Sequence, residues 1–63
     1  MDELKLKEWR KVKGFTATEL SEKSGISVQE ISRYEHGRRF PGVKNLKRLA
    51  KVLRISWRDL VSD

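Results

Sequence analysis

The 63-residue chain contains no cysteine, one proline and no long run of apolar residues. Without cysteine it can form neither a disulfide nor a thiolate metal site, so we expect a tight helical core or dimerisation to stabilise it. A helix needs about 20 consecutive apolar residues to span a membrane, and no stretch approaches that length. The first residues, 1–5, are too charged for a signal peptide. We therefore expect a single small domain over residues 1–63 that works in the cytoplasm and has no membrane partner.

Side chains that carry out chemistry are equally scarce. His36 is the only histidine, so it has no partner for metal binding or for a catalytic triad. No pair of acidic residues is placed to suggest general acid–base catalysis. We expect no enzymatic activity, no metal, no cofactor and no small-molecule ligand.

Acidic residues are few where basic residues are many. The sequence has 15 lysine and arginine residues against nine aspartate and glutamate residues, for a formal net charge of +6. The stretch from His36 to Arg58 contains no acidic residue, and its basic residues are Arg38, Arg39, Lys44, Lys47, Arg48, Lys51, Arg54 and Arg58. Surfaces that serve only solubility usually mix the two signs, so this block favours a polyanionic partner. A merely solvated basic face is the alternative.

Apolar residues at helical spacing and recognisable helix ends predict five short helices and no strand. The helices are expected at residues 3–13, 16–23, 27–36, 43–53 and 56–62. Three of them begin with a pattern typical of a capping box: Thr16 with Glu19, Ser27 with Glu30, and Ser56 with Asp59. We expect an all-α fold, a compact five-helix bundle. Its predicted core consists of Leu6, Trp9, Phe15, Leu20, Ile31, Tyr34, Leu46, Leu49, Ala50, Leu53, Ile55, Trp57 and Leu60.

The third expected helix has one face suited to a core and another suited to the base edges of DNA. Ile31 and Tyr34 lie three residues apart and would point inward together. The residues that we expect to read bases point elsewhere: Val28, Gln29, Ser32 and Arg33. Glutamine and arginine recognise adenine and guanine through paired hydrogen bonds, and valine can contact a thymine methyl group. Arg33 could equally bind a phosphate, and Gln29 could be an ordinary exposed polar residue.

Residues 16–37 resemble the helix-turn-helix of the Cro/repressor (XRE) family of DNA-binding domains, and the resemblance extends over residues 4–61. The spacing of all the matches together is specific, and they include Thr16, Glu19-Leu20, Gly25, Ile31-Ser32-Arg33, Pro41 and Leu49-Ala50. The resemblance implies a lambda-repressor-like bundle that places helix 27–36 in the major groove. It also implies a homodimer on half-sites about one helical turn apart. Most members regulate transcription in bacteria, phages or plasmids.

The resemblance also implies roles for individual residues. Arg10 and Glu35 would form a partly buried ion pair between the first and third helices. Contacts to DNA phosphates would come from Thr16, Thr18, Ser27, His36, Arg38, Arg39 and Lys44. Ala17 departs from the family pattern, because many relatives have a phosphate-binding glutamine there. Neighbouring hydroxyls and backbone N–H groups must then supply that anchor.

These features together predict sequence-specific binding of double-stranded DNA by a transcriptional regulator, in particular a repressor. Two other interpretations keep the same fold. One is a protein-interaction module, such as an antitoxin or a coactivator-like domain, and the other is a helical domain without operator binding. Selection of bound sites from random duplexes distinguishes them, since only sequence-specific binding predicts enrichment of one sequence.

Overall fold

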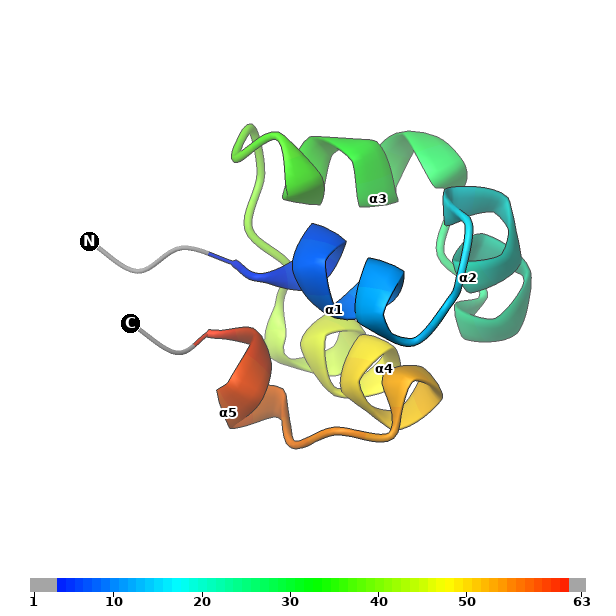
Figure 1. Ribbon diagram of the computed structural model, residues 1–63. Helices are drawn as coiled ribbons and strands as arrows, with labels where there is room; N and C mark the ends of the chain where they lie inside the picture. The colour runs from blue at the N-terminus through cyan, green and yellow to red at the C-terminus, as the bar shows by residue number, and fades with distance from the viewer. Residues whose placement is uncertain (1–3, 62–63) are drawn as a thin grey trace.

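The computed structural model describes residues 4–61, and these residues form five α-helices and no β-strand. The helices are α1 (Leu6–Val12), α2 (Ala17–Ser24), α3 (Val28–Glu35), α4 (Val43–Leu53) and α5 (Trp57–Leu60), as Figure 1 shows. The all-α fold expected from the sequence is confirmed. Within the described range, every helix is too short to cross a membrane as an apolar span.

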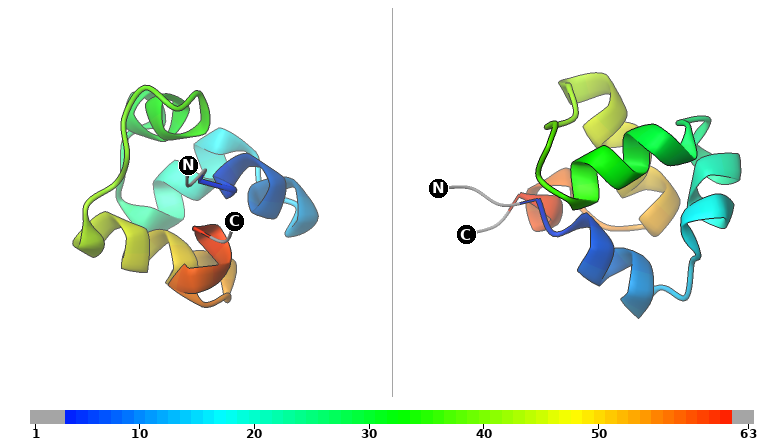
Figure 2. Two further views of the ribbon diagram at one scale, coloured as in Figure 1. Left: turned by 90° about the vertical axis from the view of Figure 1, so that its left-hand side faces the viewer. Right: turned by 90° about the horizontal axis from the view of Figure 1, so that it is seen from above.

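Two helices lie on opposite sides of the molecule, with other helices between them. Figure 1 shows α3 along one side and α4 along the other, and Figure 2 shows the same separation from a second direction. α2 packs against both α3 and α4, α1 packs against α3, and α5 packs against α4. The connection through residues 36–42 runs along the edge of the bundle from α3 to α4. No other described helix covers the outer side of α3.

All five helices contribute to the core. The largest side chains with less than 2% exposure are Leu6, Leu20, Ile31, Leu49, Leu53 and Leu60. Three more predicted core residues are buried: Tyr34, Leu46 and Ala50. Three others are partly buried and pack against the core: Trp9, Phe15 and Ile55. Full burial of an aliphatic side chain contributes about 1.5–3 kcal/mol, so these contacts are the main source of cohesion.

The structure corrects the predicted core at two positions. Trp57 was expected inside but is 40% exposed. The four-residue helix α5 buries Leu60 instead, and the Trp57 ring lies 5.5 Å from the Arg58 guanidinium carbon. Ile26 was assigned only to a connection, yet it is 5% exposed and belongs to the core. A turn residue has no periodicity, so its inward direction follows from the packing of the helices on either side.

The helices that follow a predicted capping residue begin one position later than expected. Thr16, Ser27 and Ser56 have extended backbone conformations and are the N-caps of α2, α3 and α5. Their hydroxyl oxygens accept hydrogen bonds from backbone N–H groups that have no partner within the helix. The acidic residue completes the capping box in α2 and α5. α4 has the expected bounds.

α1 and α5 are shorter than the expected ranges 3–13 and 56–62. The backbone N–H of Lys5 donates to the Leu60 carbonyl at 2.8 Å, so the chain before α1 bonds to α5. That long-range contact has no local sequence signal. The outer limits of the expected ranges, residues 3 and 62, lie outside the described residues.

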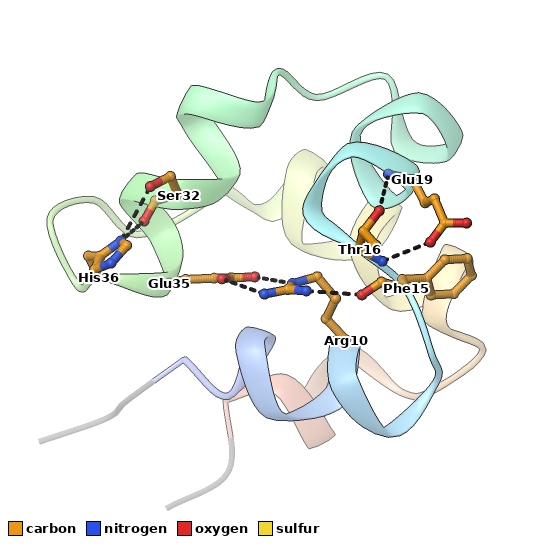
Figure 3. Close-up of polar contacts among 7 residues, drawn as sticks. All are labelled: Arg10, Phe15, Thr16, Glu19, Ser32, Glu35 and His36. Carbon is orange, nitrogen blue, oxygen red and sulfur yellow. Dashed lines mark hydrogen bonds and ion pairs between the residues drawn. The ribbon is translucent and has the colours of Figure 1, made fainter.

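A partly buried ion pair joins α1 to the end of α3, as the family resemblance implied. Arg10 Nε lies 2.7 Å from Glu35 Oε2, and Arg10 Nη2 donates to Glu35 Oε1 at 3.2 Å (Figure 3). The same guanidinium donates through Nη1 to the Phe15 carbonyl at 2.9 Å, just before α2 begins. The Arg10 and Glu35 side chains are only 13% and 7% exposed. The hydrogen bond from Arg10 to Glu35 raises the pKa of Arg10 above its ordinary value. Arg10 therefore fixes three segments relative to one another.

We expect the Glu35→Ala variant to lose about 3–5 kcal/mol of unfolding free energy, because Arg10 would stay buried without its anion. Urea or thermal unfolding measures the loss. The control is Glu22→Ala, which removes an exposed carboxylate from α2 and should change the unfolding free energy by about 0.5 kcal/mol or less. A loss as small as that of the control would show that the pair behaves as a surface salt bridge.

Candidate nucleic-acid interface

The turn between α2 and α3 has a defined geometry. Gly25 ends α2 with a φ of +75°, in the left-handed region that glycine adopts without strain. Its N–H donates to the Ser21 carbonyl at 2.9 Å. The buried Ser24 hydroxyl accepts a hydrogen bond from the Ile26 N–H at 3.2 Å. Because Ile26 is itself buried, the turn is anchored in the core and sets the direction of α3.

α3 turns one side to the core and leaves the other side uncovered. Ile31 and Tyr34 are buried, as expected from the sequence. Of the four residues predicted to read bases, Val28, Gln29 and Arg33 are exposed and Ser32 is partly buried. With 3.6 residues per turn, Gln29, Ser32 and Arg33 point away from the direction shared by Ile31 and Tyr34. Val28 lies three residues before Ile31, at the flank between the two sides of the helix. Figure 1 shows α3 at the edge of the bundle, with one side that no other helix covers.

Glu30 does not complete the capping box predicted for α3. Its backbone N–H donates to Ser27 Oγ at 3.1 Å, but its carboxylate makes no return bond to Ser27. The carboxylate instead accepts a hydrogen bond from the Tyr34 hydroxyl at 3.1 Å. It also lies 3.4 Å from Arg33 Nη1 and 3.1 Å from Arg39 Nε. The prediction of a complete box was wrong because three donors compete for the carboxylate in the folded chain.

His36 follows α3, and its ring is hydrogen-bonded to the last turn of that helix. His36 Nδ1 lies 2.8 Å from the Ser32 carbonyl oxygen and 3.3 Å from Ser32 Oγ (Figure 3). Because a carbonyl oxygen can only accept a hydrogen bond, Nδ1 carries the proton in this arrangement. Nε2 of the neutral ring is then an acceptor. The predicted donation to a phosphate therefore requires the protonated ring.

Basic residues follow directly after α3. Gly37 has a φ of +71°, which allows the chain to turn back over the end of the helix. The N–H groups of Arg38 and Arg39 then donate to the Arg33 carbonyl at 2.9 and 3.3 Å. Both arginine side chains are exposed, and so is Lys44 in the first turn of α4. The end of α3 thus holds two of the predicted phosphate-binding cations in place.

The other basic residues of α4 lie further along the exposed face of the helix that Lys44 also occupies. α4 directs its leucines into the core, which leaves exposed Lys47, Arg48 and Lys51 on its outer side. α3 and α4 lie on opposite sides of the bundle (Figure 2), and these three residues follow Lys44 along α4 by about one to two helical turns. A solvated basic face accounts for them without a contact to the same DNA segment.

The start of α2 offers hydroxyl groups but also a carboxylate. Thr16 Oγ1 accepts from the Glu19 N–H at 3.1 Å, and the Thr16 N–H donates to Glu19 Oε1 at 2.9 Å (Figure 3). The bond from the Thr16 backbone lowers the pKa of Glu19, so this side chain is ionised at neutral pH. Thr18 is exposed and Ala17 is partly buried. The Glu19 charge opposes a phosphate at this helix start.

Polar contacts that join α3 to α4 were not predicted from the sequence. Asn45 Nδ2 donates to the Tyr34 hydroxyl oxygen at 3.0 Å, and that hydroxyl donates to Glu30. The four-residue spacing of Glu30 and Tyr34 on one helix was a usable signal for their bond. Asn45 lies eleven residues beyond Tyr34 on another helix, and no local pattern indicates that contact.

Comparison with known proteins finds a helix-turn-helix family model that matches residues 6–60. Over 53 residues the chain is 43% identical to y4dJ of Sinorhizobium fredii, which is named an uncharacterized HTH-type transcriptional regulator. That match covers 84% of this chain and 69% of y4dJ.

The fold is similar to solved structures of SinR. A chain of the SinR protein/SinI protein complex matches with a TM-score of 0.88 and 30% identity. The match covers 94% of this chain, which spans only 58% of that one. SinR, the master regulator for biofilm formation, in complex with DNA matches with a TM-score of 0.84 and 32% identity. That second match covers 89% of this chain and 90% of the other.

We expect the Gly25→Ala variant to lose about 1–2 kcal/mol of unfolding free energy, because alanine is strained at a positive φ. An added Cβ would meet no atom within 4 Å, so crowding contributes nothing. Gly42→Ala is the control, since Gly42 also has open space but has a φ of −67°. Denaturant unfolding should show the larger loss for Gly25→Ala. Equal losses would mean that the left-handed turn is not what this position requires.

Proposed function

The chain belongs to the helix-turn-helix family of the Cro/repressor (XRE) type, and we propose that it is a transcriptional regulator that binds double-stranded DNA sequence-specifically. The main support for the proposal is the pattern of buried and exposed side chains on α3. Buried Ile31 and Tyr34 hold this helix against the core, while Gln29 and Arg33 remain exposed on its uncovered side. The likeness to SinR, which has a structure in complex with DNA, supports the same function.

In the proposed complex, α3 lies in the major groove and α2 lies across the DNA backbone. The Gln29 amide would read adenine through a pair of hydrogen bonds, and Val28 would contact a thymine methyl group. Ser32 is small enough to let the helix approach the bases. The proposed activity is binding alone and includes no chemical step.

The affinity would come mainly from residues outside α3. Arg33 is the only basic residue of α3, and Glu30 and Glu35 offset its charge. Arg38, Arg39 and Lys44 follow the helix without an intervening acidic residue and would neutralise phosphates. Hydrogen bonds to the DNA phosphates would also come from Thr16, Thr18 and Ser27. The protonated ring of His36 would donate another.

We further propose that two copies bind two related half-sites about one helical turn apart, as helix-turn-helix dimers do. α5 carries Trp57, whose exposed ring is available for a contact between copies. Occupancy of such an operator would hinder RNA polymerase, so the regulator would act as a repressor in the cytoplasm. We propose the same DNA-binding and repressor activity for any longer protein that contains this domain.

Selection of bound sites from a random duplex pool tests the proposed function. We expect one half-site sequence to be enriched, in pairs whose spacing reports the dimer. Failure to enrich any sequence would contradict DNA recognition and favour a protein-interaction module. The complex that SinR forms with SinI makes such a module the natural second candidate.

The Gln29→Ala variant should lose about 1–3 kcal/mol of binding free energy on the selected site, because one base pair loses its paired hydrogen bonds. Binding to random duplexes should stay nearly unchanged. Fluorescence anisotropy with both duplexes measures the difference. Val12→Ala, on an exposed α1 side chain, is the control and should alter neither affinity. Equal losses on the two duplexes would remove Gln29 from the base-reading set.

Replacing Arg38 or Lys44 by alanine should weaken binding to every duplex, because each loses one phosphate contact. Each variant should reduce the slope of log affinity against log salt by about one. Titrations at several salt concentrations measure the slopes. Lys51→Ala, about two helical turns beyond Lys44 on α4, is the matched control and should leave the slope nearly unchanged. A variant whose slope equals that of the control does not lose a phosphate contact.

A further inference from the structure

We propose that Glu30 positions Arg33 to read a guanine and holds Arg39 beside it, which makes Glu30 a specificity-determining residue. The proposal rests on the proposed function, since it concerns how the same surface recognises DNA. Glu30 occupies the edge of α3 between the uncovered side and the core, and its side chain is 20% exposed. An acidic residue at this place repels phosphates, so its presence calls for a compensating role.

The Glu30 carboxylate is not used to cap its own helix. The first turn of α3 is capped by the Ser27 hydroxyl, which accepts from the Glu30 backbone N–H. Both carboxylate oxygens are directed to other side chains. Oε1 lies 3.4 Å from Arg33 Nη1, and Oε2 lies 3.1 Å from Arg39 Nε and from the Tyr34 hydroxyl.

A chain of two hydrogen bonds, from Asn45 through Tyr34, holds the Glu30 carboxylate on the side that faces α4. The Asn45 amide donates to the Tyr34 hydroxyl oxygen at 3.0 Å. The hydroxyl proton of Tyr34 is therefore left for Glu30, at 3.1 Å. Tyr34 is only 3% exposed, so its ring position is fixed by the core. The position of Glu30 is thus set by α4 through a buried tyrosine.

The two arginines keep most of their donors free in this arrangement. Arg33 and Arg39 are 56% and 62% exposed, and Glu30 engages only one nitrogen of each. A guanidinium has five N–H donors, so Arg33 retains enough to contact guanine O6 and N7 together. A braced side chain also loses less conformational entropy on binding than a free one.

The Glu30 charge also favours bases over phosphates as the target of Arg33. A phosphate that approached Arg33 would be repelled by the neighbouring carboxylate, whereas a guanine edge is uncharged. Of the two roles that the sequence left open for Arg33, this favours base reading over phosphate binding. Arg39 belongs to the connection after α3, and the same carboxylate holds its guanidinium next to the reading helix.

The experiment compares the wild type with Glu30→Gln, Arg33→Ala and the double variant on the duplex selected by the wild type. Each protein is titrated against that duplex, against all its single base-pair changes and against random DNA. Arg33→Ala should lose about 5- to 150-fold discrimination at one G·C pair. Glu30→Gln should lose at least about threefold at the same pair and at no other. The double variant should match Arg33→Ala.

Two further variants separate positioning from charge and from folding. Glu22→Gln makes the same charge change on exposed α2 and should keep full discrimination. Tyr34→Phe keeps the Glu30 charge but removes the hydroxyl that holds it, and should relax the same G·C pair less than Glu30→Gln does. In Glu30→Gln the introduced amide oxygen can still accept from the Tyr34 hydroxyl, and thermal unfolding checks that all variants remain folded.

Several outcomes would overturn the inference while leaving the proposed function intact. They are unchanged discrimination in Glu30→Gln, a loss spread evenly over all positions, and a double variant that loses more than Arg33→Ala. The inference would also be overturned if Arg33→Ala kept the full base discrimination of the wild type. Failure of the wild type to select any sequence would instead refute the proposed function, and the inference would fall with it.

Discussion

The orientation of the helix-turn-helix depends on the guanidinium of Arg10. It bonds Glu35 at the end of α3 and the Phe15 carbonyl before α2, so one partly buried cation links both helices of the motif to α1. The apolar core holds the helices together, but apolar contacts are non-directional. Hydrogen bonds from a planar, rigid group have a fixed geometry. The ion pair therefore contributes orientation, while the leucines contribute cohesion.

The charged residues around α3 fall into two groups, those paired within the helix region and those that follow it. Acidic Glu30 and Glu35 offset the one basic residue of the helix, and both acidic side chains are tied to arginines. The uncompensated positive charge begins with Arg38, just beyond the end of the helix. In the proposed complex, such a separation would leave α3 to discriminate among bases, while the following connection would supply attraction that is common to all DNA.

Much of this surface follows from local rules. The N-caps Thr16, Ser27 and Ser56 marked the starts of three helices, and Ile31 with Tyr34 identified the inner side of α3. The same rules failed where several partners competed for one side chain. Glu30 was expected to cap α3, but the Tyr34 hydroxyl and two arginines engage its carboxylate instead. Trp57 was expected in the core for a different reason, its place in an apolar pattern, but the one-turn helix α5 buries Leu60 and leaves the indole 40% exposed.

The sequence by itself determined the number of helices, most of the core and the side of α3 that faces outward, because periodicity and capping act over three or four residues. Tertiary structure alone decided how these pieces meet. Three contacts join segments whose sequences give no sign of one another. They are the bond from Asn45 to Tyr34, the burial of Ile26 in its turn and the pairing of Lys5 with Leu60. Those contacts exist only once the core has brought the helices together, since directional bonds form between groups already held at the right distance.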